Sequence, residues 1–161
     1  MEATIAELKA TIGALILLLI MTGNGDLVKS SDIHGKVNKT ELNYLSAAMQ
    51  LENESGGDEC LLLTGSVILN RMNYPDLSEA GDGVYGVIMS HKWGWQYASK
   101  TRKNFTTLKA DKHIRMLAKY LLTYGPICPE NVIYQSQNSK LGSKLYKKIK
   151  TTSGWEYFAY E

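Results

Sequence analysis

Cysteine, proline and recognisable cofactor motifs are scarce in this sequence, and each scarcity excludes a class of protein. Among 161 residues there are 2 cysteines and 3 prolines. The cysteines, Cys60 and Cys128, lie outside any Cys-x-x-Cys spacing, which argues against a zinc site and a disulfide-rich scaffold. No phosphate-binding loop, dinucleotide-binding Gly-x-Gly-x-x-Gly or Gly-x-Ser-x-Gly elbow occurs. The sequence therefore predicts no metal and no cofactor, and it leaves the oxidation state of the cysteines open.

Acidic residues are scarce in the C-terminal part of the chain. The segment from Lys100 to Glu161 holds 12 of the 18 lysines and arginines but 4 of the 16 acids, namely Asp111, Glu130, Glu156 and Glu161. A basic region of this kind suits contact with an anionic polymer, although scattered lysines are also typical of a solvated helix face. No nucleic-acid reader motif accompanies the lysines, so we expect no nucleic-acid partner.

An uncharged apolar run, TIGALILLLIMT, lies near the N-terminus at residues 11–22. It is shorter than the roughly twenty residues of a comfortable transmembrane helix. We interpret residues 1–23 as an export segment or weak membrane anchor, with membrane association through residues 11–22, and residues 24–39 as a polar linker. The alternative is a helix buried against the domain. Cleavage of the segment is left open.

Residues 40–161 are long enough for one domain, and their pattern predicts an α+β fold, mainly helical with a small antiparallel sheet. Asn38 and Glu41 form a capping-box pattern that should begin one helix, which Gly56 and Gly57 end. Further helices are expected at about 59–72, 84–89, 108–124 and 141–149, and strands at 132–134 and 155–160. The helix at 59–72 is apolar nearly all round, so it should be buried.

Glu52 is the most informative residue. It continues a helical stripe formed by Leu42, Leu45 and Met49, and a carboxylate on an apolar stripe is costly unless it is neutral or paired. Burial raises the pKa of such a carboxyl, and a protonated Glu near neutral pH is what a glycosidase acid requires. A helix-end Glu that reaches solvent or pairs with Arg71 is the other interpretation of the same pattern.

Other acids nearby have simpler explanations. Glu54 lies nearly opposite the apolar stripe at 100° per residue, so it should face water or cap the next helix. Asp58 and Glu59 fall in the first turn of that helix, where acids suit the helix dipole.

Aromatic and amide side chains cluster downstream. Sugar rings have apolar faces that lie well on aromatic rings, while amides bond sugar hydroxyls, so such a cluster suits a glycan groove. The candidate substrate-binding residues are Trp95, Gln96, Tyr97, Tyr134 and Gln135. The competing interpretation places two of the three aromatics among Trp93, Trp95 and Tyr97 in the core.

Three blocks of the chain resemble the SleB-like cell wall hydrolases, a family of spore cortex-lytic enzymes and related phage lysins. The first is Glu52 followed by the V-I-L-N-R run at 67–71, the second is the G-V-I run at 86–88 followed by Gln96 and Tyr97, and the weaker third is V-I-Y at 132–134 with Tyr157 and Phe158. The resemblance covers about residues 42–160 and aligns Glu52 with the catalytic Glu of the family. Family members often have E-A-x-G-E after that Glu, whereas this chain has Asn53-Glu54-Ser55-Gly56, so Glu54 stays an alternative acid.

The resemblance implies a lysozyme-like fold that cleaves the β-1,4 bond between N-acetylmuramic acid and N-acetylglucosamine in peptidoglycan. It implies a lytic transglycosylase with Glu52 as its single acid and base. We also expect a monomer that acts outside the cytoplasm, secreted or membrane-anchored. If water attacks instead, a second carboxylate must hold it, and Asp82, Asp76 and Glu54 are the candidates. A hydrolytic muramidase and a non-catalytic glycan-binding module of the same fold are the alternatives, and a membrane-disrupting protein is a more distant one.

Overall fold

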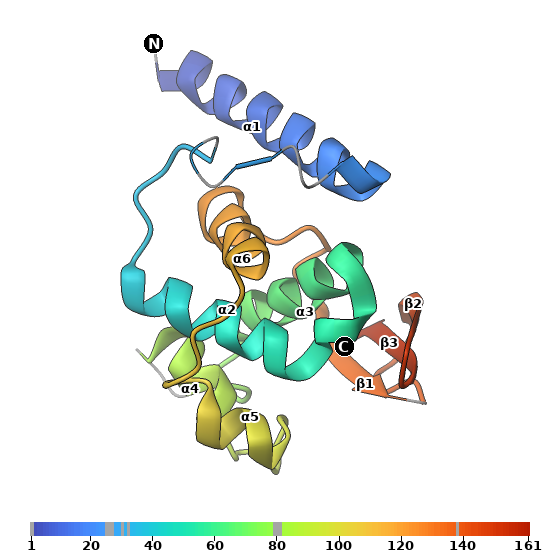
Figure 1. The fold of residues 1–161 in the computed structure, drawn as a ribbon. Helices are drawn as coiled ribbons and strands as arrows, with labels where there is room; N and C mark the ends of the chain where they lie inside the picture. The colour runs from blue at the N-terminus through green and yellow to red at the C-terminus, as the bar shows by residue number, and fades with distance from the viewer. Residues whose placement is uncertain (1, 25–27, 30, 32, 79–81, 138) are drawn as a thin grey trace.

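The structure is a computed structural model that describes residues 2–24, 28–29, 31, 33–78, 82–137 and 139–161. It is an α+β protein in which helices precede a small three-stranded antiparallel sheet (Figure 1). The helices are α1 (Glu2–Leu19), α2 (Lys39–Asn53), α3 (Gly57–Arg71), α4 (Gly83–Met89), α5 (Ser99–Asn104) and α6 (Lys112–Tyr124). The strands are β1 (Val132–Gln137), β2 (Leu145–Thr151) and β3 (Gly154–Tyr160), in the order β1-β3-β2.

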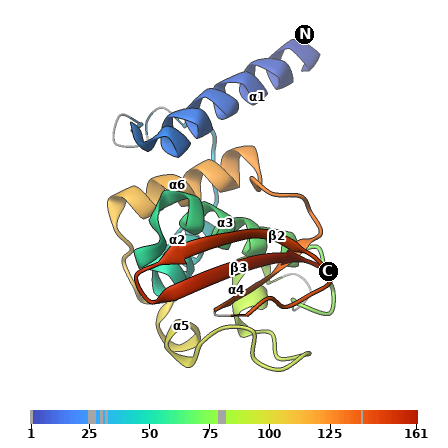
Figure 2. The same cartoon turned by 90° about the vertical axis from the view of Figure 1, so that its right-hand side faces the viewer.

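The helix α3 lies between two hydrophobic clusters. On one side, Leu62 and Ile68 pack with residues of α2 and α6; on the other, Leu63 and Val67 pack with Phe158 of β3. The side chains of both sets are almost fully buried. This confirms the prediction that α3, which is apolar nearly all round, lies in the interior of the protein. Figure 2 shows the sheet in front of this helical layer, facing the viewer.

Close approach around α3 depends on Gly65. A Cβ atom at this position would lie 2.4 Å from Leu121 Cδ1 of α6 and 2.9 Å from Met49 Sδ of α2. Both distances are shorter than van der Waals contact, so glycine lets α2 and α6 meet α3 here.

The predicted capping of α2 is confirmed in part. Asn38 Oδ1 accepts hydrogen bonds from the backbone N–H groups of Thr40 (2.8 Å) and Glu41 (3.3 Å). The Glu41 carboxylate does not close the box; it accepts a hydrogen bond from the Val84 N–H (2.9 Å) at the first turn of α4. A residue expected to cap its own helix therefore joins α2 to α4.

The prediction of a basic helix at 141–149 is wrong. Residues 145–151 form β2, and Tyr146 and Ile149 both pack on the second hydrophobic cluster. Their spacing of three resembles a helical repeat, but the register shifts between Leu145 and Lys147, and such a bulge changes which side chains face the core. Pairing with β3 thus decided the conformation of this segment.

Two other boundaries differ from the sequence-based ones. α6 begins at Lys112 rather than at Leu108, because Asp111 caps it by accepting the His113 N–H at 2.7 Å. The short helix α5 was not predicted. The strands expected at 132–134 and 155–160 are present as β1 and β3.

The N-terminal helix α1 packs along α6 (Figure 1). Tyr120 donates a hydrogen bond from its hydroxyl to the Gly13 carbonyl (3.1 Å), and Ile16 and Ile20 enter the main core. α1 is longer than the short apolar helix expected, because it also includes the charged Glu2–Lys9 stretch. Its packing corresponds to the alternative of a helix laid on the domain.

Part of α1 faces outward: Leu8, Leu15 and Leu18 are exposed, and so is Met21, which follows the helix. Within the described residues, no helix combines the length and apolar content needed to cross a membrane. Val28 and Ile33, from the segment expected to be a polar linker, are buried, while residues 25–27, 30 and 32 of that segment lie outside the described part. The domain boundaries at 23 and 39 stay predictions.

The Asn70 side chain, at the end of α3, gives the first prediction. Its amide donates to the carbonyls of Pro129 (2.8 Å) and Val132 (3.0 Å), which ties α3 to the start of β1. We expect Asn70→Ala to lower the free energy of unfolding by about 2 kcal/mol, because two carbonyl oxygens lose their donor. Urea denaturation measures this loss. Asn73→Ala is the control, since Asn73 is exposed; an equal loss in both variants would show that the amide contacts are not its cause.

Candidate active site

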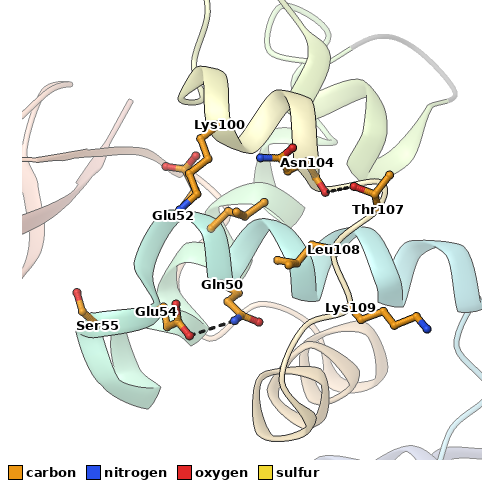
Figure 3. Close-up of a pocket in the computed structure, with 10 residues that line it drawn as sticks. Gln50, Glu52, Glu54, Ser55, Lys100, Asn104, Thr107, Leu108 and Lys109 are labelled. Atoms are coloured by element: carbon orange, nitrogen blue, oxygen red, sulfur yellow. Dashed lines mark hydrogen bonds between the residues drawn. The ribbon is translucent and has the colours of Figure 1, made fainter.

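Glu52 lies in the last turn of α2, where two cavities meet. The first cavity has a volume of about 320 Å³ and is lined by Glu52, Arg71, Gln96, Tyr97, Gln135 and Glu156 among others; we call it the two-carboxylate cavity. The second has a volume of about 840 Å³ and is lined by Glu52, Glu54, Lys100, Asn104 and Lys109 among others; we call it the lysine cavity (Figure 3). Leu51 and Glu52 line both cavities, so the carboxyl stands at their junction.

Burial governs the protonation of Glu52. The side chain is half-buried, and desolvation raises the pKa of its carboxyl above the ordinary value of 4.5. The Thr101 hydroxyl, the Ala98 backbone N–H and the Arg71 charge act in the opposite direction, because each favours the ionised form. The Thr101 hydroxyl is near enough to influence the carboxyl, but its geometry falls short of a hydrogen bond. Among the described residues, Glu52 Oε1 and Thr101 Oγ1 are both buried without a hydrogen-bond partner. Burial therefore shifts the carboxyl toward its protonated form, and one of its oxygens is unengaged among the described residues.

Arg71 approaches Glu52 without forming an ion pair with it, as far as the described residues show. Its Nε donates to the Ile133 carbonyl at 2.7 Å, and its Cζ lies 5.2 Å from the centre of the Tyr97 ring. The guanidinium is almost fully buried, so these contacts fix it between β1 and Tyr97. The interpretation of Glu52 as a simple salt-bridge partner of Arg71 is therefore wrong.

A second carboxyl, Glu156, lies in the same cavity and was missed by sequence reasoning. It is 3% exposed, on β3. Burial raises the pKa of Glu156, and the negative charge of Glu52 raises it further, whereas the side-chain amides of Gln135 and Asn53 lower it. Because electrostatic interaction between two acids is reciprocal, each charge makes ionisation of the other less favourable.

A signal for Glu156 is present in the sequence. Successive side chains of a strand point to opposite faces of the sheet. Glu156 lies two residues before the core residue Phe158 on β3, so both side chains point to the same inward face. The acids that sequence reasoning offered as a second carboxylate, Asp76, Asp82 and Glu54, are all exposed. Of these, Glu54 reaches the lysine cavity, where its carboxylate accepts a hydrogen bond from Gln50 Nε2 at 3.0 Å (Figure 3).

The structure brings three of the five expected substrate-binding residues next to Glu52: Gln96, Tyr97 and Gln135 line the two-carboxylate cavity. Tyr97 is almost fully buried, and burial raises the pKa of its hydroxyl. Tyr134 instead lines a third cavity of about 480 Å³, together with Tyr74, Trp93, Gln96 and Leu141 among others; we call it the aromatic cavity.

Trp95 lies apart from these three cavities. The residue is 56% exposed, and its ring stacks against the Arg102 guanidinium, whose Cζ is 4.0 Å from the ring centre. Arg102 also donates to the Tyr97 carbonyl, so this stacking holds the loop that carries Gln96 and Tyr97. Neither Trp93 nor Trp95 is a core residue, since both are exposed.

A fourth cavity of about 440 Å³ continues the series. It is lined by Lys39, Asn43, Thr106, Thr107, Leu108, Lys109 and Arg115, and we call it the basic cavity. It shares Thr107, Leu108 and Lys109 with the lysine cavity, just as the two-carboxylate and aromatic cavities share Gln96. The four cavities are therefore linked one to the next by shared lining residues, with Glu52 at the central link; we call this series the row of cavities, and such a series suits an extended ligand.

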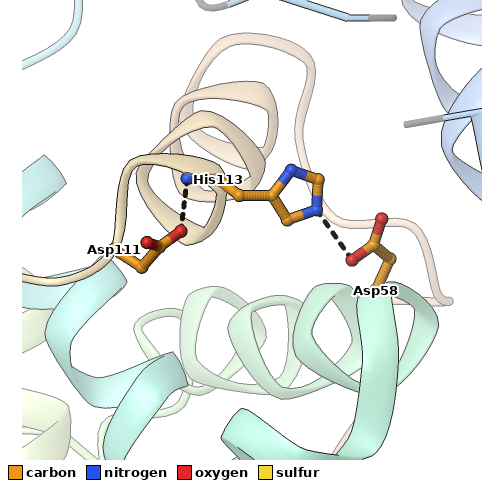
Figure 4. Close-up of polar contacts among 3 residues, drawn as sticks. All are labelled: Asp58, Asp111 and His113. Atoms are coloured by element: carbon orange, nitrogen blue, oxygen red, sulfur yellow. Dashed lines mark hydrogen bonds and ion pairs between the residues drawn. The ribbon is translucent and has the colours of Figure 1, made fainter. Parts of the chain in front are cut away.

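His113 and Asp58 form a polar contact outside this row (Figure 4). His113 Nε2 lies 2.8 Å from Asp58 Oδ1, which joins the first turn of α6 to the first turn of α3. Both acids near His113, Asp58 and Asp111, lie at helix starts, as expected for structural residues. Within the described part of the chain, no cluster of three or more His, Cys, Asp or Glu side chains could hold a metal ion.

Comparison with known proteins gives no match: no family model, no curated protein and no solved structure matches this chain. The chemistry of the candidate site therefore rests on its own residues.

The raised carboxyl pKa values predict a pH-dependent effect on stability. A buried acid whose pKa is raised in the folded state stabilises the fold while it is protonated, and that contribution is lost as the pH rises through the folded-state pKa. We expect Glu52→Gln and Glu156→Gln to raise the free energy of unfolding at pH 7, with the difference from wild type shrinking toward zero below pH 4.5. Urea denaturation at a series of pH values measures it.

The matched control is Glu54→Gln, because Glu54 is exposed two residues further along the chain. We expect Glu54→Gln to change the free energy of unfolding little at any pH of the series. A gain for Glu54→Gln equal to that for Glu52→Gln would contradict burial as the cause.

Proposed function

We propose that the protein is a peptidoglycan-cleaving glycosidase that cuts the β-1,4 bond between N-acetylmuramic acid and N-acetylglucosamine, with Glu52 as its acid. One observation carries the proposal: a carboxyl whose pKa burial raises, with one oxygen unpartnered, stands in the middle of a row of adjoining cavities. A general acid must hold a proton near working pH and reach the atom that receives it. The row of cavities supports an extended ligand such as a glycan strand.

In the proposed reaction, Glu52 gives its proton to the glycosidic oxygen as the bond from C1 to that oxygen breaks. The 6-hydroxyl of the muramic acid residue then bonds to C1, and its proton passes to the Glu52 carboxylate. The products are a 1,6-anhydro end and a free 4-hydroxyl end, and the enzyme regains its starting state. This lytic transglycosylase route needs one carboxyl, because the substrate supplies the nucleophile.

The family resemblance supports the same proposal through the residues that carry it. Glu52 and Arg71, from the first block, and Gln96 and Tyr97, from the second, all line the two-carboxylate cavity although they come from three separate segments. A lysozyme-like fold and action outside the cytoplasm, with export or membrane association through residues 11–22, are part of the proposal. They follow from the resemblance and from the apolar N-terminal run.

Replacement of the acid tests the proposal directly. We expect Glu52→Gln to lower the rate of wall lysis at least about 100-fold, because a general acid contributes roughly 10²- to 10⁴-fold. Zymography and turbidity loss of purified walls measure it, with the free energy of unfolding as the check that the variant folds.

Two variants sharpen the test. Glu130→Gln is the surface control, since Glu130 is exposed and outside the four cavities. Glu54→Gln decides between the two acids offered by the sequence, and we expect it to keep measurable activity. Lysis by Glu52→Gln at the wild-type rate would show that Glu52 is not the acid, whereas a wild-type protein that binds walls without lysing them would leave a non-catalytic glycan-binding module as the remaining interpretation.

Glu156 supports a second candidate, a hydrolytic muramidase. A carboxylate in the same cavity as the acid could orient and deprotonate a water molecule, as in glycosidases that use a pair of acids. Its burial and its repulsion by Glu52 favour the protonated form, which is a poor base, so we retain the transglycosylase route as the first candidate.

The chemical form of the product separates the two routes. Mass spectrometry of digested muropeptides should find 1,6-anhydro ends, and these should persist in Glu156→Gln at whatever rate that variant retains. Reducing ends in the wild-type digest, lost together with activity in Glu156→Gln, would favour the hydrolytic route instead.

A further inference from the structure

The charged residues that line the basic cavity are all of one sign. Its wall holds three cations, Lys39 at the start of α2, Lys109 before α6 and Arg115 on α6, and no carboxylate. In Figure 1 the segment leading from α5 to α6 passes along α2, which brings these residues together. The contact is fixed by the Asp111 N–H, which donates to Gln50 Oε1 at 2.9 Å.

The acids on the neighbouring elements are engaged elsewhere. Glu41 of α2 accepts the Val84 N–H, and Asp111, which precedes α6, accepts the His113 N–H. Glu54 accepts from Gln50. The ion pairs found among the described residues, Asp58 with His113 and Glu59 with Lys147, include none of the three cations.

Arg115 is held in place rather than free to swing away. Its Nη1 donates to Asn43 Oδ1 at 2.7 Å, which anchors one edge of the guanidinium to α2. Among the described residues its other N–H groups have no hydrogen-bond partner, so they can bond a ligand. Three like charges around one cavity repel each other, and an anion placed between them removes that repulsion. Of the two threonines in the same wall, Thr107 already donates to the Asn104 carbonyl at 3.1 Å, so Thr106 is the threonine whose hydroxyl can donate to such a group.

The basic cavity adjoins the candidate active site. It shares Thr107, Leu108 and Lys109 with the lysine cavity, which has Glu52 at its other end. Figure 3 shows Lys100 and Glu52 on one side of the lysine cavity and Lys109 on the other. A polymer that passes Glu52 would therefore bring its substituents to the basic cavity.

We propose that the basic cavity binds an anionic substituent of the wall polymer, a carboxylate of the stem peptide or a phosphate of an attached chain, while the bond to be cut lies at Glu52. This inference rests on the proposed function, because it takes its ligand from the same polymer. It assigns the two ends of the row different roles: the basic cavity recognises charge, and the aromatic cavity offers rings to uncharged sugar.

Binding to soluble wall fragments tests the assignment without turnover. The full-length Glu52→Gln protein serves as the background, and isothermal titration measures its affinity for three fragment preparations: untreated, stripped of stem peptides by an amidase, and stripped of phosphate polymers by hydrofluoric acid. We expect Lys39→Gln with Arg115→Gln to weaken binding of untreated fragments about tenfold, because two charge-assisted contacts are lost. Added salt should reduce the difference.

The fragment that abolishes the difference identifies the source of the anion. If stem-peptide removal equalises the two proteins, the ligand is a peptide carboxylate; if phosphate removal does so, it is a phosphate. The charge-matched control is Lys103→Gln with Lys112→Gln, since both lysines are exposed and lie outside the cavities.

Several results would overturn the inference: unchanged binding in the Lys39 and Arg115 variant, an equal loss in the control variant, a loss that persists after both treatments, or tighter binding to DNA than to wall fragments. Failure of the proposed function has a different signature. In that case the wild-type protein leaves all three fragment preparations uncut, whatever the affinities are.

Discussion

The position of α3, buried on both sides, is the constraint on which the rest of the structure depends. Because its apolar residues face α2 and α6 on one side and the sheet on the other, the helix fixes the distance between the helical layer and the strands. The polar residues at its end, Asn70 and Arg71, then bond to carbonyls at the start of β1. This arrangement brings the end of α2, with Glu52, to the same cavity as Glu156 of β3.

Two acids that share a cavity have linked protonation. Burial raises the pKa of the Glu52 carboxyl, and the Arg71 charge lowers it. The pKa of Glu156 is raised by burial and by the negative charge of Glu52. Arg71 is confined by its contacts with Ile133 and the Tyr97 ring, so a fixed positive charge acts near a carboxyl that is otherwise desolvated. Such opposing influences are typical of acids whose protonation state is used in a reaction.

The cavities on either side of Glu52 differ in character, and that difference gives the proposed glycan site a direction. Tyr74, Trp93 and Tyr134 line the aromatic cavity, whereas Lys39, Lys109 and Arg115 line the basic cavity. A neutral glycan strand that carries charged substituents has both features, since its sugar rings present apolar faces and its substituents present anions. The distribution of side chains along the row thus supports a polymer more than a small molecule.

Local sequence patterns determined the parts of this protein in which neighbouring residues decide the conformation. The Asn38 cap, the interior helix α3, the short helix α4 and the strands β1 and β3 could all be predicted, because capping, continuous apolarity and alternation are local properties. The exceptional position of Glu52 on an apolar stripe was visible for the same reason. β2 was not predicted, because Tyr146 and Ile149 take their environment from β3 and from a bulge that spacing alone does not reveal.

Only the tertiary structure decided which side chains share a cavity. Glu156 lies far from Glu52 in the sequence, and its inward direction acquires meaning once β3 is placed against the ends of α2 and α3. Trp95 is of a residue type common in ligand-binding sites, yet it stacks on Arg102 outside the cavity that Gln96 and Tyr97 line. Residue type and spacing indicate which chemistry a side chain is capable of. Its charge state and its access to a ligand depend on its neighbours in space, and these come from distant segments of the chain.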